Sequence, residues 1–223
     1  MSEIVQGTEA WHAARLGKVT ASRIADVCTR TKSGFGAGRK NYMAELVAER
    51  LTGARTEGFT NAAMQWGTDQ EPDARSAYQF YANRRVSQIG FIDHPSIAET
   101  GASPDGLVGE DGLVEIKCPN TATHIETLLG GSVPEKYILQ MQWQMACTGR
   151  QWCDFASFDP RLPETMRLFV RRLDRDDTLI ASVEADVTDF LNELRDIVRR
   201  LRAKYDPQPA EELPEAALLL SAG

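Results

Sequence analysis

The stretch TGASPDGLVGEDGLVEIKCP, residues 100–119, places three charged side chains at fixed spacing among apolar residues and glycines. Asp105 is followed, after nine residues, by Glu115, and Lys117 stands two positions beyond Glu115. The apolar residues around the last two predict a strand, on which residues two apart point to the same face. An Asp-Gly pair in the middle of the stretch is a hairpin turn signal. The sequence therefore predicts a hairpin that brings Asp105 beside Glu115 and Lys117.

Two carboxylates and a lysine on one strand face indicate a metal site. Acids held close together repel each other unless a cation lies between them, and carboxylate oxygens with water suit Mg²⁺. A lysine beside such an ion can orient or deprotonate a water molecule, or stabilise charge on a phosphate. The alternative is a solvated strand face with an ion pair. Against that alternative, Glu115 and Lys117 lie inside an otherwise apolar run.

The composition is ordinary for a soluble globular protein. The 223 residues are 42% hydrophobic and 26% charged, and no apolar run approaches the ~18 residues of a membrane span. The first residues show no basic region followed by an apolar one, so no signal peptide is expected. Four cysteines in a chain of this length do not suggest a disulfide framework. We expect a cytoplasmic protein with no membrane partner.

Charge is unevenly distributed along the chain. The net charge of −7 argues at first against a nucleic-acid ligand. Residues 11–40, however, contain seven basic residues and one acid, a local charge of +6, whereas residues 206–223 contain four acids and no base. A local basic surface on an acidic protein is compatible with binding a phosphate backbone in a confined channel, and equally with a solvated helix face.

Several other kinds of functional site are not indicated. The four cysteines lack the tight spacing of an iron–sulfur site, and the three histidines form no zinc pattern. The sequence also contains no P-loop and no dinucleotide-binding glycine motif, so an ATP-driven mechanism is not expected. Buried free thiols are the favoured interpretation of the cysteines.

The hydrophobic periodicity predicts helices before and after a central set of strands. The predicted helices cover residues 8–16, 20–28, 41–51, 61–81, 121–129, 134–147 and 177–204. The predicted strands cover residues 86–92, 97–102, 152–158 and 166–173 in addition to the hairpin. This order predicts a single α/β domain, residues 1–205, with a central mixed sheet flanked by helices. Residues 206–223 form an acidic, proline-containing C-terminal tail.

Residues outside the hairpin could complete its site. Glu71, in a predicted helix, could be a third metal ligand, although a surface glutamate is the more common role. Tyr137 and Gln140 lie three apart on one helix face, where both could bind a water molecule or a phosphate oxygen. The alternative for this pair is ordinary polar packing. Gln142 and Gln144 are competing candidates, and only Gln144 shares the face of Gln140.

A second group suggests a phosphate pocket. Arg15, Ser22 and Ser103 offer one guanidinium and two hydroxyl groups, which together could bind a phosphate near a helix start. Each of these residues is individually more often structural.

Taken together, these residues resemble the phage lambda exonuclease family of the PD-(D/E)xK nuclease superfamily. Pro104-Asp105 with Glu115-Ile116-Lys117 matches the superfamily motif. The wider family match consists of ordered blocks across about residues 9–176, namely EAWH…RLG…TAS from Glu9, WG…E from Trp66, SPDGL from Ser103, EIKCP from Glu115, Y…QMQ from Tyr137 and FDPR from Phe158.

The resemblance implies a Mg²⁺-dependent exonuclease that degrades one strand of double-stranded DNA processively in the 5′→3′ direction. It implies a 3′ single strand as product, a ring-shaped homotrimer, and a single-strand annealing protein as partner in recombination. It further implies a phage or prophage gene acting in the cytoplasm of a bacterial host.

The resemblance also implies roles for individual residues. Asp105, Glu115 and the main-chain carbonyl of Ile116 would bind metal, and Glu71 would complete a second metal site, so that two Mg²⁺ ions, or Mn²⁺ in their place, are expected. Lys117 would activate the attacking water, which Gln140 and Tyr137 would place. The residues implied to contact the 5′-phosphate are Arg15, Ser22 and Ser103. Lys32 would reach into the DNA, and Met64 would act as a wedge at the terminal base pair.

Two features depart from the family pattern. Family members carry an arginine shortly after the Cys-Pro, where this chain has Thr123, and Pro72 directly follows Glu71. Two alternative functions stay open. One is a related structure-specific or restriction-type endonuclease of the same superfamily, and the other is an end-binding protein without chemistry. Closed circular DNA that stays intact would distinguish the exonuclease from the endonuclease. Hydrolysis of linear DNA would distinguish it from the end-binding protein.

Overall fold

The computed structural model describes residues 5–32, 34–56 and 62–206. The predicted tail, apart from Asp206, lies outside these residues. The elements in chain order are α1 (Glu9–Arg15), β1 (Val19–Thr20), the 3₁₀ helix η1 (Ala21–Arg23), α2 (Ile24–Cys28), β2 (Arg30–Thr31), β3 (Gly34–Phe35), α3 (Ala37–Thr52), α4 (Ala62–Ala82), β4 (Val86–Ser87), β5 (Ile92–Asp93), β6 (Thr100–Ala102), β7 (Gly106–Val108), β8 (Gly112–Lys117), α5 (Thr121–Gly130), α6 (Glu135–Thr148), β9 (Trp152–Phe158), η2 (Glu164–Met166), β10 (Leu168–Asp174) and α7 (Asp177–Tyr205). Within the described ranges, no helix is both long enough and apolar enough to cross a membrane.

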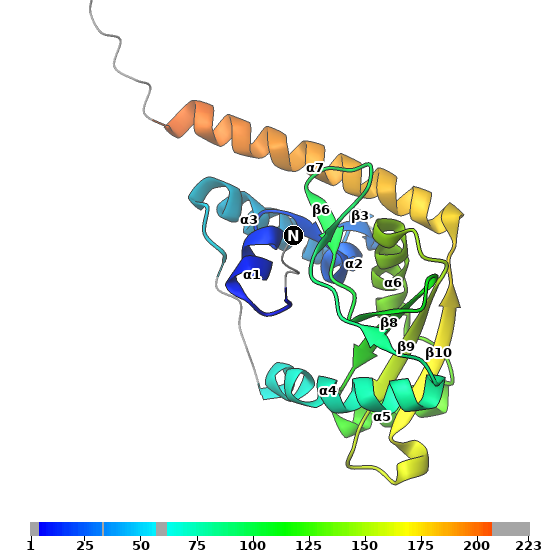
Figure 1. The fold of residues 1–223 in the computed structure, drawn as a ribbon. Coiled ribbons are helices and arrows are strands. Elements are labelled where there is room, and N and C mark those ends of the chain that lie inside the picture. The colour runs from blue at the N-terminus through cyan, green and yellow to red at the C-terminus, as the bar shows by residue number, and fades with distance from the viewer. Residues whose placement is uncertain (1–4, 33, 57–61, 207–223) are drawn as a thin grey trace, which may run out of the picture.

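A five-stranded mixed sheet forms the centre of the fold (Figure 1). Its strand order is β10-β9-β8-β7-β4, and β8 runs parallel to β9 while the other neighbours are antiparallel. A parallel pair requires a crossover connection, which α5 and α6 provide between β8 and β9. The predicted mixed α/β architecture is therefore confirmed.

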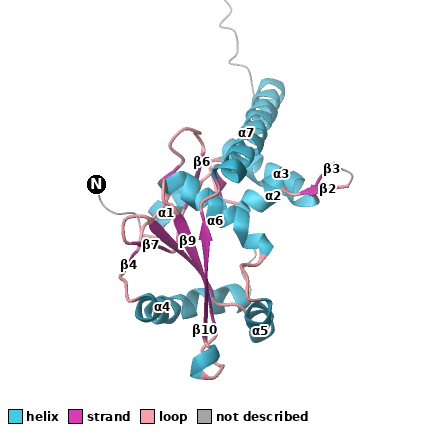
Figure 2. Cartoon of the chain, turned by 90° about the vertical axis from the view of Figure 1, so that its right-hand side faces the viewer, coloured by secondary structure: helices cyan, strands magenta, loops and turns pink. Residues whose placement is uncertain are grey.

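Helices cover both faces of this sheet, as Figure 2 shows. Val114 and Ile116 of β8 share a buried cluster with α4, whereas Leu113 of the same strand shares another with Met141 and Met145 of α6. Successive residues of a strand point to opposite faces, so a strand covered on both sides needs an almost continuous apolar run. This explains the apolar run around Glu115 and makes the buried Glu115 an exception within it.

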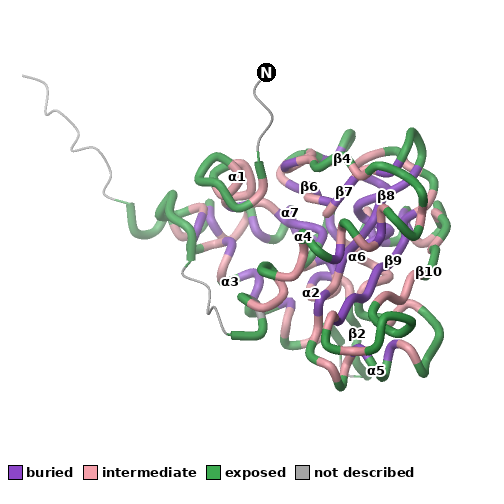
Figure 3. Tube along the Cα trace, turned by 60° about the horizontal axis from the view of Figure 1, so that its bottom comes forward, coloured by how far each residue is buried: buried purple, intermediate pink, exposed green. Residues whose placement is uncertain are grey.

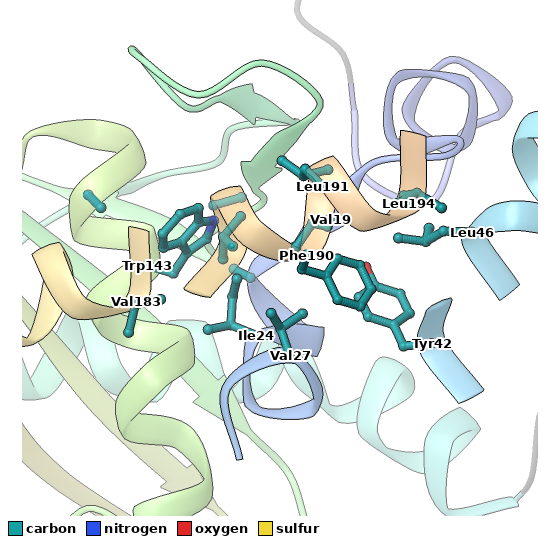
Figure 4. Packing of buried hydrophobic residues seen from close by; sticks show 14 of the residues in the cluster. Val19, Ile24, Val27, Tyr42, Leu46, Trp143, Val183, Phe190, Leu191 and Leu194 are labelled. Carbon is teal, nitrogen blue, oxygen red and sulfur yellow. The ribbon is translucent and has the colours of Figure 1, made fainter. Parts of the chain in front are cut away.

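A second, helical cluster lies beside the sheet. The apolar stripe of α7 packs against α2, α3 and α6. Figure 4 shows Trp143 of α6 and Val183 of α7 on one side of this cluster. On the other side, the rings of Tyr42 and Phe190 stack with centroids 5.8 Å apart. Helix α7 begins where the Asp176 side chain accepts a hydrogen bond from the Leu179 amide. This cluster fixes α3 and η1 relative to the sheet.

The structure differs from the predicted elements in four places. The predicted helix of residues 20–28 is divided into η1 and α2, and Thr20 belongs to β1. Helix α4 continues through Pro72 as one helix, with Ala74 and Tyr78 fully buried beyond it. Residues 86–102 form three short strands instead of two, because β4 pairs with β7 in the large sheet while β5 pairs with β6 in a separate three-stranded sheet. The predicted loop after residue 28 contains the β2–β3 hairpin.

Candidate active site and phosphate pocket

The predicted hairpin is present and places Asp105 beside Glu115. In the antiparallel β7–β8 pair, Gly106 lies opposite Val114, so Asp105 enters the pair opposite Glu115. The Oδ2 atom of Asp105 accepts a hydrogen bond of 2.7 Å from the Ile116 amide. One carboxylate oxygen of Asp105 is thus fixed to the backbone of β8, and strand register alone brings the two acids together.

Glu115 is a buried carboxylate with three hydrogen-bond donors. Its side chain is 1% exposed, and its Oε1 atom lies 2.5 Å from Lys117 Nζ. Gln140 Nε2 donates to Oε1 and Gln144 Nε2 donates to Oε2, each at 2.6 Å. The two glutamines stand one turn apart on α6. Because a buried charge is costly without partners, these donors explain how β8 tolerates an acid in its core.

The acids in this region outnumber the cation that they share. Burial raises the pKa of Asp105 well above its usual value, and the charges of Glu115 and Glu71 raise it further, against the opposing effect of Lys117. For Lys117, burial would lower the pKa, but Glu115 and Asp105 outweigh that effect and raise it. Lys117 is therefore an ammonium group beside the side chains of Glu115 and Asp105.

The side chains of Asp105, Glu115 and Glu71 fit a hard divalent cation, because carboxylate oxygens are the ligands that such an ion prefers. The mutual repulsion that raises the pKa of Asp105 is the kind that a bound cation relieves. Among the described residues, however, no group of three or more acidic, histidine or cysteine side chains is already gathered around one point. Glu71 forms an ion pair with Arg75 through one of its carboxylate oxygens, Oε1.

Tyr137 contacts the catalytic lysine candidate through the face of its ring. Lys117 Nζ lies 5.2 Å from the ring centroid, and the ring also stacks on Phe155 with centroids 5.3 Å apart. Tyr137 and Gln140 therefore both lie beside Lys117 and Glu115, on the helix that the sequence indicated. Their roles in placing a water molecule stay predictions.

A basic pocket of about 280 Å³ lies between α1, η1 and α3. Arg15 and Ser22 both line it, as predicted for a phosphate pocket. The charged residues of its wall are four bases and two acids, and the full polar set is His12, Arg15, Lys18, Thr20, Ser22, Arg23, Tyr42, Glu45, Glu49, Arg55 and Thr56. Helix α1 contains no buried residue, and Figure 3 shows it outside the buried centre of the molecule.

Arg15 is fixed in place without a carboxylate partner. Its guanidinium lies 4.0 Å from the centre of the Trp11 ring, and its Nη1 atom is 3.5 Å from Ser103 Oγ. Trp11 Nε1 donates to the same hydroxyl oxygen at 2.9 Å. Among the described residues Arg15 forms no ion pair, and burial is the main cause that lowers its pKa. A guanidinium in such a setting is suited to an external anion.

Ser103 connects the pocket to the hairpin. It follows β6 and precedes Asp105 by two residues, so the residue that contacts Arg15 and Trp11 belongs to the segment that carries the first carboxylate. Ser22 is exposed on the pocket wall, with its hydroxyl 3.4 Å from Thr20 Oγ1. The structure thus places Arg15 and Ser22 in the wall of one pocket, with Ser103 in contact with Arg15.

The structure places the remaining predicted substrate contacts elsewhere. Lys32 is exposed at the turn of the β2–β3 hairpin, which Figure 2 shows on the opposite side of the molecule from β7 and α1. The same hairpin is joined to α7 by Arg30, which pairs with Asp186 at 2.6 Å. Met64 belongs to α4, and its side chain lies outside the described part of the structure. Contacts of both residues with DNA stay predictions.

Sequence reasoning missed several residues near the site. Gln144 was only a competing candidate, although its spacing of four from Gln140 was the available signal. Arg55, whose Nη1 lies 2.9 Å from His12 Nδ1, gave no signal because it lies 40 residues from Arg15. Asp159 and Arg161 were named only within the FDPR block, without a role.

Asp159 and Arg161 form an ion pair with two side-chain hydrogen bonds, which we call the clip. Asp159 is fully buried and accepts bonds from Arg161 Nε at 2.7 Å and Nη2 at 2.9 Å. The guanidinium lies 4.4 Å from the centre of the Trp66 ring of α4, and its Nη2 is 3.4 Å from the Pro119 carbonyl oxygen. Burial would raise the pKa of Asp159, but hydrogen bonds from Arg161 and Thr121 outweigh it and hold the pKa at about 2.

Comparison with known proteins places this arrangement in a family. The family model for a YqaJ-like viral recombinase domain matches residues 10–151. The crystal structure of an alkaline exonuclease, LHK-Exo from Laribacter hongkongensis, is 57% identical, with 88% of this chain and 97% of that chain covered and a TM-score of 0.83. The same exonuclease in complex with dAMP gives 57% identity and a TM-score of 0.84, with the same coverage.

A more distant structure shares the fold. A phage-related exonuclease from Haemophilus somnus 129PT is 15% identical, with 82% of this chain and 96% of that chain covered and a TM-score of 0.67. The comparison with curated proteins found no match. The domain match across the hairpin and the pocket, together with the close similarity to LHK-Exo, shows that the chain belongs to the YqaJ-like viral recombinase family, which is lambda-exonuclease-like.

Proposed function

We propose that this chain is a Mg²⁺-dependent 5′→3′ exonuclease that processively degrades one strand of double-stranded DNA from a free end. It leaves a 3′ single strand for annealing-type recombination. The observation that carries the proposal is the short link from Ser103, in contact with Arg15, to Asp105, opposite Glu115. The similar LHK-Exo is named as an alkaline exonuclease, and it binds dAMP, the kind of mononucleotide that an exonuclease releases.

The phosphate pocket accounts for the direction of degradation. Arg15, Ser22 and Ser103 hold the terminal 5′-phosphate, which sets the first phosphodiester bond of the same strand over the hairpin. A strand that presents a 3′ end has no terminal phosphate for this pocket in an ordinary duplex. The guanidinium of Arg15, which lacks an ion pair among the described residues, supports this assignment.

The hairpin accounts for hydrolysis. Asp105, Glu115 and the Ile116 carbonyl would hold one Mg²⁺ and Glu71 would complete a second site, with Mn²⁺ as a substitute. When bound, such ions supply positive charge to the attacking and leaving oxygens. Lys117 activates and orients the attacking water, and Tyr137 and Gln140 help to place it. Gln144 keeps the buried Glu115 carboxylate in position through its contact with Oε2.

The remaining parts of the proposal concern DNA and protein partners. Lys32 reaches DNA beyond the hairpin and the phosphate pocket. Met64 separates the terminal base pair, since an unbranched apolar side chain suffices for a wedge. The enzyme acts as a homotrimer with a single-strand annealing protein, in the cytoplasm of a bacterial host that carries a phage or prophage. The family match to a viral recombinase domain supports this setting.

A labelled linear duplex tests the proposal. The substrate carries either a 5′ or a 3′ label, with or without a 5′-phosphate, and is incubated with the protein and Mg²⁺. We expect rapid release of the 5′ label, faster digestion of phosphorylated ends, no digestion with EDTA, and intact closed circular DNA. Rapid release of the 3′ label contradicts the polarity, indifference to the phosphate contradicts the pocket, and cutting of the circle indicates an endonuclease instead.

A further inference from the structure

A second basic pocket, of about 500 Å³, lies where the C-terminal half of α7 runs beside α3 (Figure 1). Four arginines and one glutamate form almost all of its wall, and the lining residues are Arg50, Glu99, Arg195, Val198, Arg199 and Arg202. In a chain with a net charge of −7, such a concentration of guanidinium groups requires an explanation. None of these residues belongs to the candidate active site or to the first pocket.

Glu99 is the one acid in this wall, and two arginines share it. Its Oε1 atom lies 2.8 Å from Arg50 Nη1, and its Oε2 atom lies 2.6 Å from Arg195 Nε. The backbone of Glu99 has φ of 66°, a left-handed conformation that non-glycine residues seldom adopt. One carboxylate balances only one of the two guanidinium groups, so the pocket keeps an excess of positive charge.

Arg50 is the buried floor of this pocket. Its side chain is 13% exposed, and its Nε atom donates to the Gly17 carbonyl at 2.9 Å. Its Nη2 atom is buried and has no hydrogen-bond partner among the described residues. Burial lowers the pKa of Arg50, and the charge of Arg195 adds to that effect against the opposing charge of Glu99. A buried donor without an acceptor is costly, and an anion in the pocket would supply the acceptor.

The arginines of α7 form the open side of the pocket. Residues 195, 199 and 202 follow the spacing that places side chains on one helix face. Arg202 donates from Nη2 to the Arg50 carbonyl oxygen at 2.9 Å, which joins this face to α3. The side chains of Arg195 and Arg199 are 46% and 78% exposed, and each already pairs with one carboxylate, Arg195 with Glu99 and Arg199 with Asp196. Each guanidinium has further N–H groups that can donate to a large anion along the surface.

The two basic pockets lie on either side of Gly17. Its amide donates to Glu49 Oε2 at 2.8 Å, and Glu49 lines the first pocket, whereas its carbonyl accepts from Arg50, which lines the second. Neighbouring residues of α3 therefore connect a pocket suited to a terminal phosphate with another basic pocket. This favours a single extended polyanion as the ligand of both.

We infer that the pocket formed by Arg50, Arg195, Arg199 and Arg202 binds a backbone phosphate of the DNA whose end occupies the first pocket. The inference rests on the proposed function. The planar, forked guanidinium group matches phosphate oxygens, and exposed arginines with a buried one behind them suit a phosphodiester that passes over the surface. The contact is independent of the DNA sequence and holds the duplex in place beyond the first pocket.

Equilibrium binding without catalysis tests this inference. The full-length protein is titrated into a fluorescent 5′-phosphorylated duplex hairpin in EDTA at several salt concentrations, and anisotropy is measured. We expect the double substitution Arg195→Gln with Arg199→Gln to weaken binding about tenfold at low salt. Because one phosphate contact is lost, the slope of log K against log salt falls by about 1. Melting temperatures verify that the variant is folded.

Arg200→Gln is the control for a charge lost from the same helix outside the pocket lining, and it is compared with the single substitutions Arg195→Gln and Arg199→Gln, which each remove one charge as well. We expect it to leave affinity and salt slope nearly unchanged. An equal loss in the control, or wild-type binding by the double variant, overturns the inference. Absence of duplex binding by the wild-type protein would instead refute the proposed function.

The acidic C-terminal residues are the competing occupant, because they contain Glu211, Glu212 and Glu215 without a base. Substitution of all three by glutamine in the full-length chain distinguishes this case. If those changes and the double arginine variant lower the melting temperature equally and without additivity, while DNA binding is unaffected, the acidic residues fill the pocket and the inference is wrong.

Discussion

The catalytic hairpin and the first phosphate pocket are built in different ways. In the hairpin, Asp105 and Glu115 face each other because two adjacent strands pair in a fixed register, and the Ile116 amide fixes one carboxylate directly. In the pocket, Arg15 and Ser22 come from separate elements, and Arg15 is oriented by Trp11 and Ser103. Strand register is a local constraint, whereas the pocket depends on how α1 is placed against η1 and α3.

The two regions also differ in charge. The hairpin has more carboxylates than cations, and this excess raises the pKa of Asp105. The pocket has more arginine and lysine than acid, and Arg15 has no carboxylate partner among the described residues. Opposite potentials side by side are suited to a cation in one region and a phosphate in the other. Under the proposed roles of the two regions, we expect end recognition and hydrolysis to be separable by mutation.

The largest effect is expected in the hairpin. Asp105→Asn keeps an oxygen that can accept from the Ile116 amide but removes the negative charge. We expect hydrolysis to fall at least about a thousandfold, as for other residues that act as part of a catalytic unit. Binding of a phosphorylated DNA end stays within a few fold of wild type. Single-turnover digestion and anisotropy in EDTA measure the two quantities.

A variant that loses end binding together with hydrolysis would show that the two regions do not act separately. Undiminished hydrolysis would remove Asp105 from the site altogether. The melting temperature of the variant serves as the control for folding.

The next effect is expected in the pocket. Arg15→Gln removes a charged donor and leaves the hairpin intact, so we expect a loss of about 10–100-fold in the preference for 5′-phosphorylated ends. Digestion of 5′-hydroxyl ends changes little. Initial rates on matched phosphorylated and unphosphorylated duplexes measure the ratio. Arg85→Gln, which removes an exposed charge outside the pocket, is the control, and an equal loss on both kinds of end contradicts the assignment.

A smaller effect separates the two glutamines that hold Glu115. Gln144→Leu removes the hydrogen-bond donor of Oε2 in a buried site, at a cost of about 1–3 kcal/mol in the free energy of unfolding. Gln140→Leu costs less, because Lys117 still contacts Oε1. Urea unfolding of the two variants measures the difference. A larger loss for Gln140→Leu would show that the lysine contact does not compensate.

The smallest effect concerns the clip formed by Asp159 and Arg161. The pKa of Asp159 lies at about 2, below its ordinary value of 3.8, so its stabilising effect is complete above pH 3.8 and is lost as the pH falls toward 2. We expect Asp159→Asn to lower the melting temperature by about 2–4 °C at pH 5.

Well below pH 2 the difference between Asp159→Asn and wild type should disappear, since Asp159 is then protonated in both the folded and the unfolded state of the wild-type protein. Melting curves across this range provide the measurement. A difference that stays constant with pH would assign the effect to packing and not to the ionised carboxylate.

Much of the catalytic side could be predicted from sequence, because its geometry is local. The spacing of Asp105, Glu115 and Lys117 indicated a hairpin, and the structure contains it. The paired role of Gln140 and Gln144 was less clear, since helix spacing shows that they share a face but not which strand they face. Contacts such as Arg161 over Trp66 gave no signal, because they join residues far apart in the sequence.

By itself the sequence determined the mixed α/β architecture, the acids and lysine of the hairpin, and a basic segment near the N-terminus. Periodicity and strand register act over a few residues, so a sequence records them directly. Only the tertiary structure decided that Ser103 lies beside Arg15, that Arg55 joins the first pocket, and that Arg50 meets the arginines of α7 in a second one. Those contacts depend on how buried helices pack against one another, and no local pattern specifies that packing.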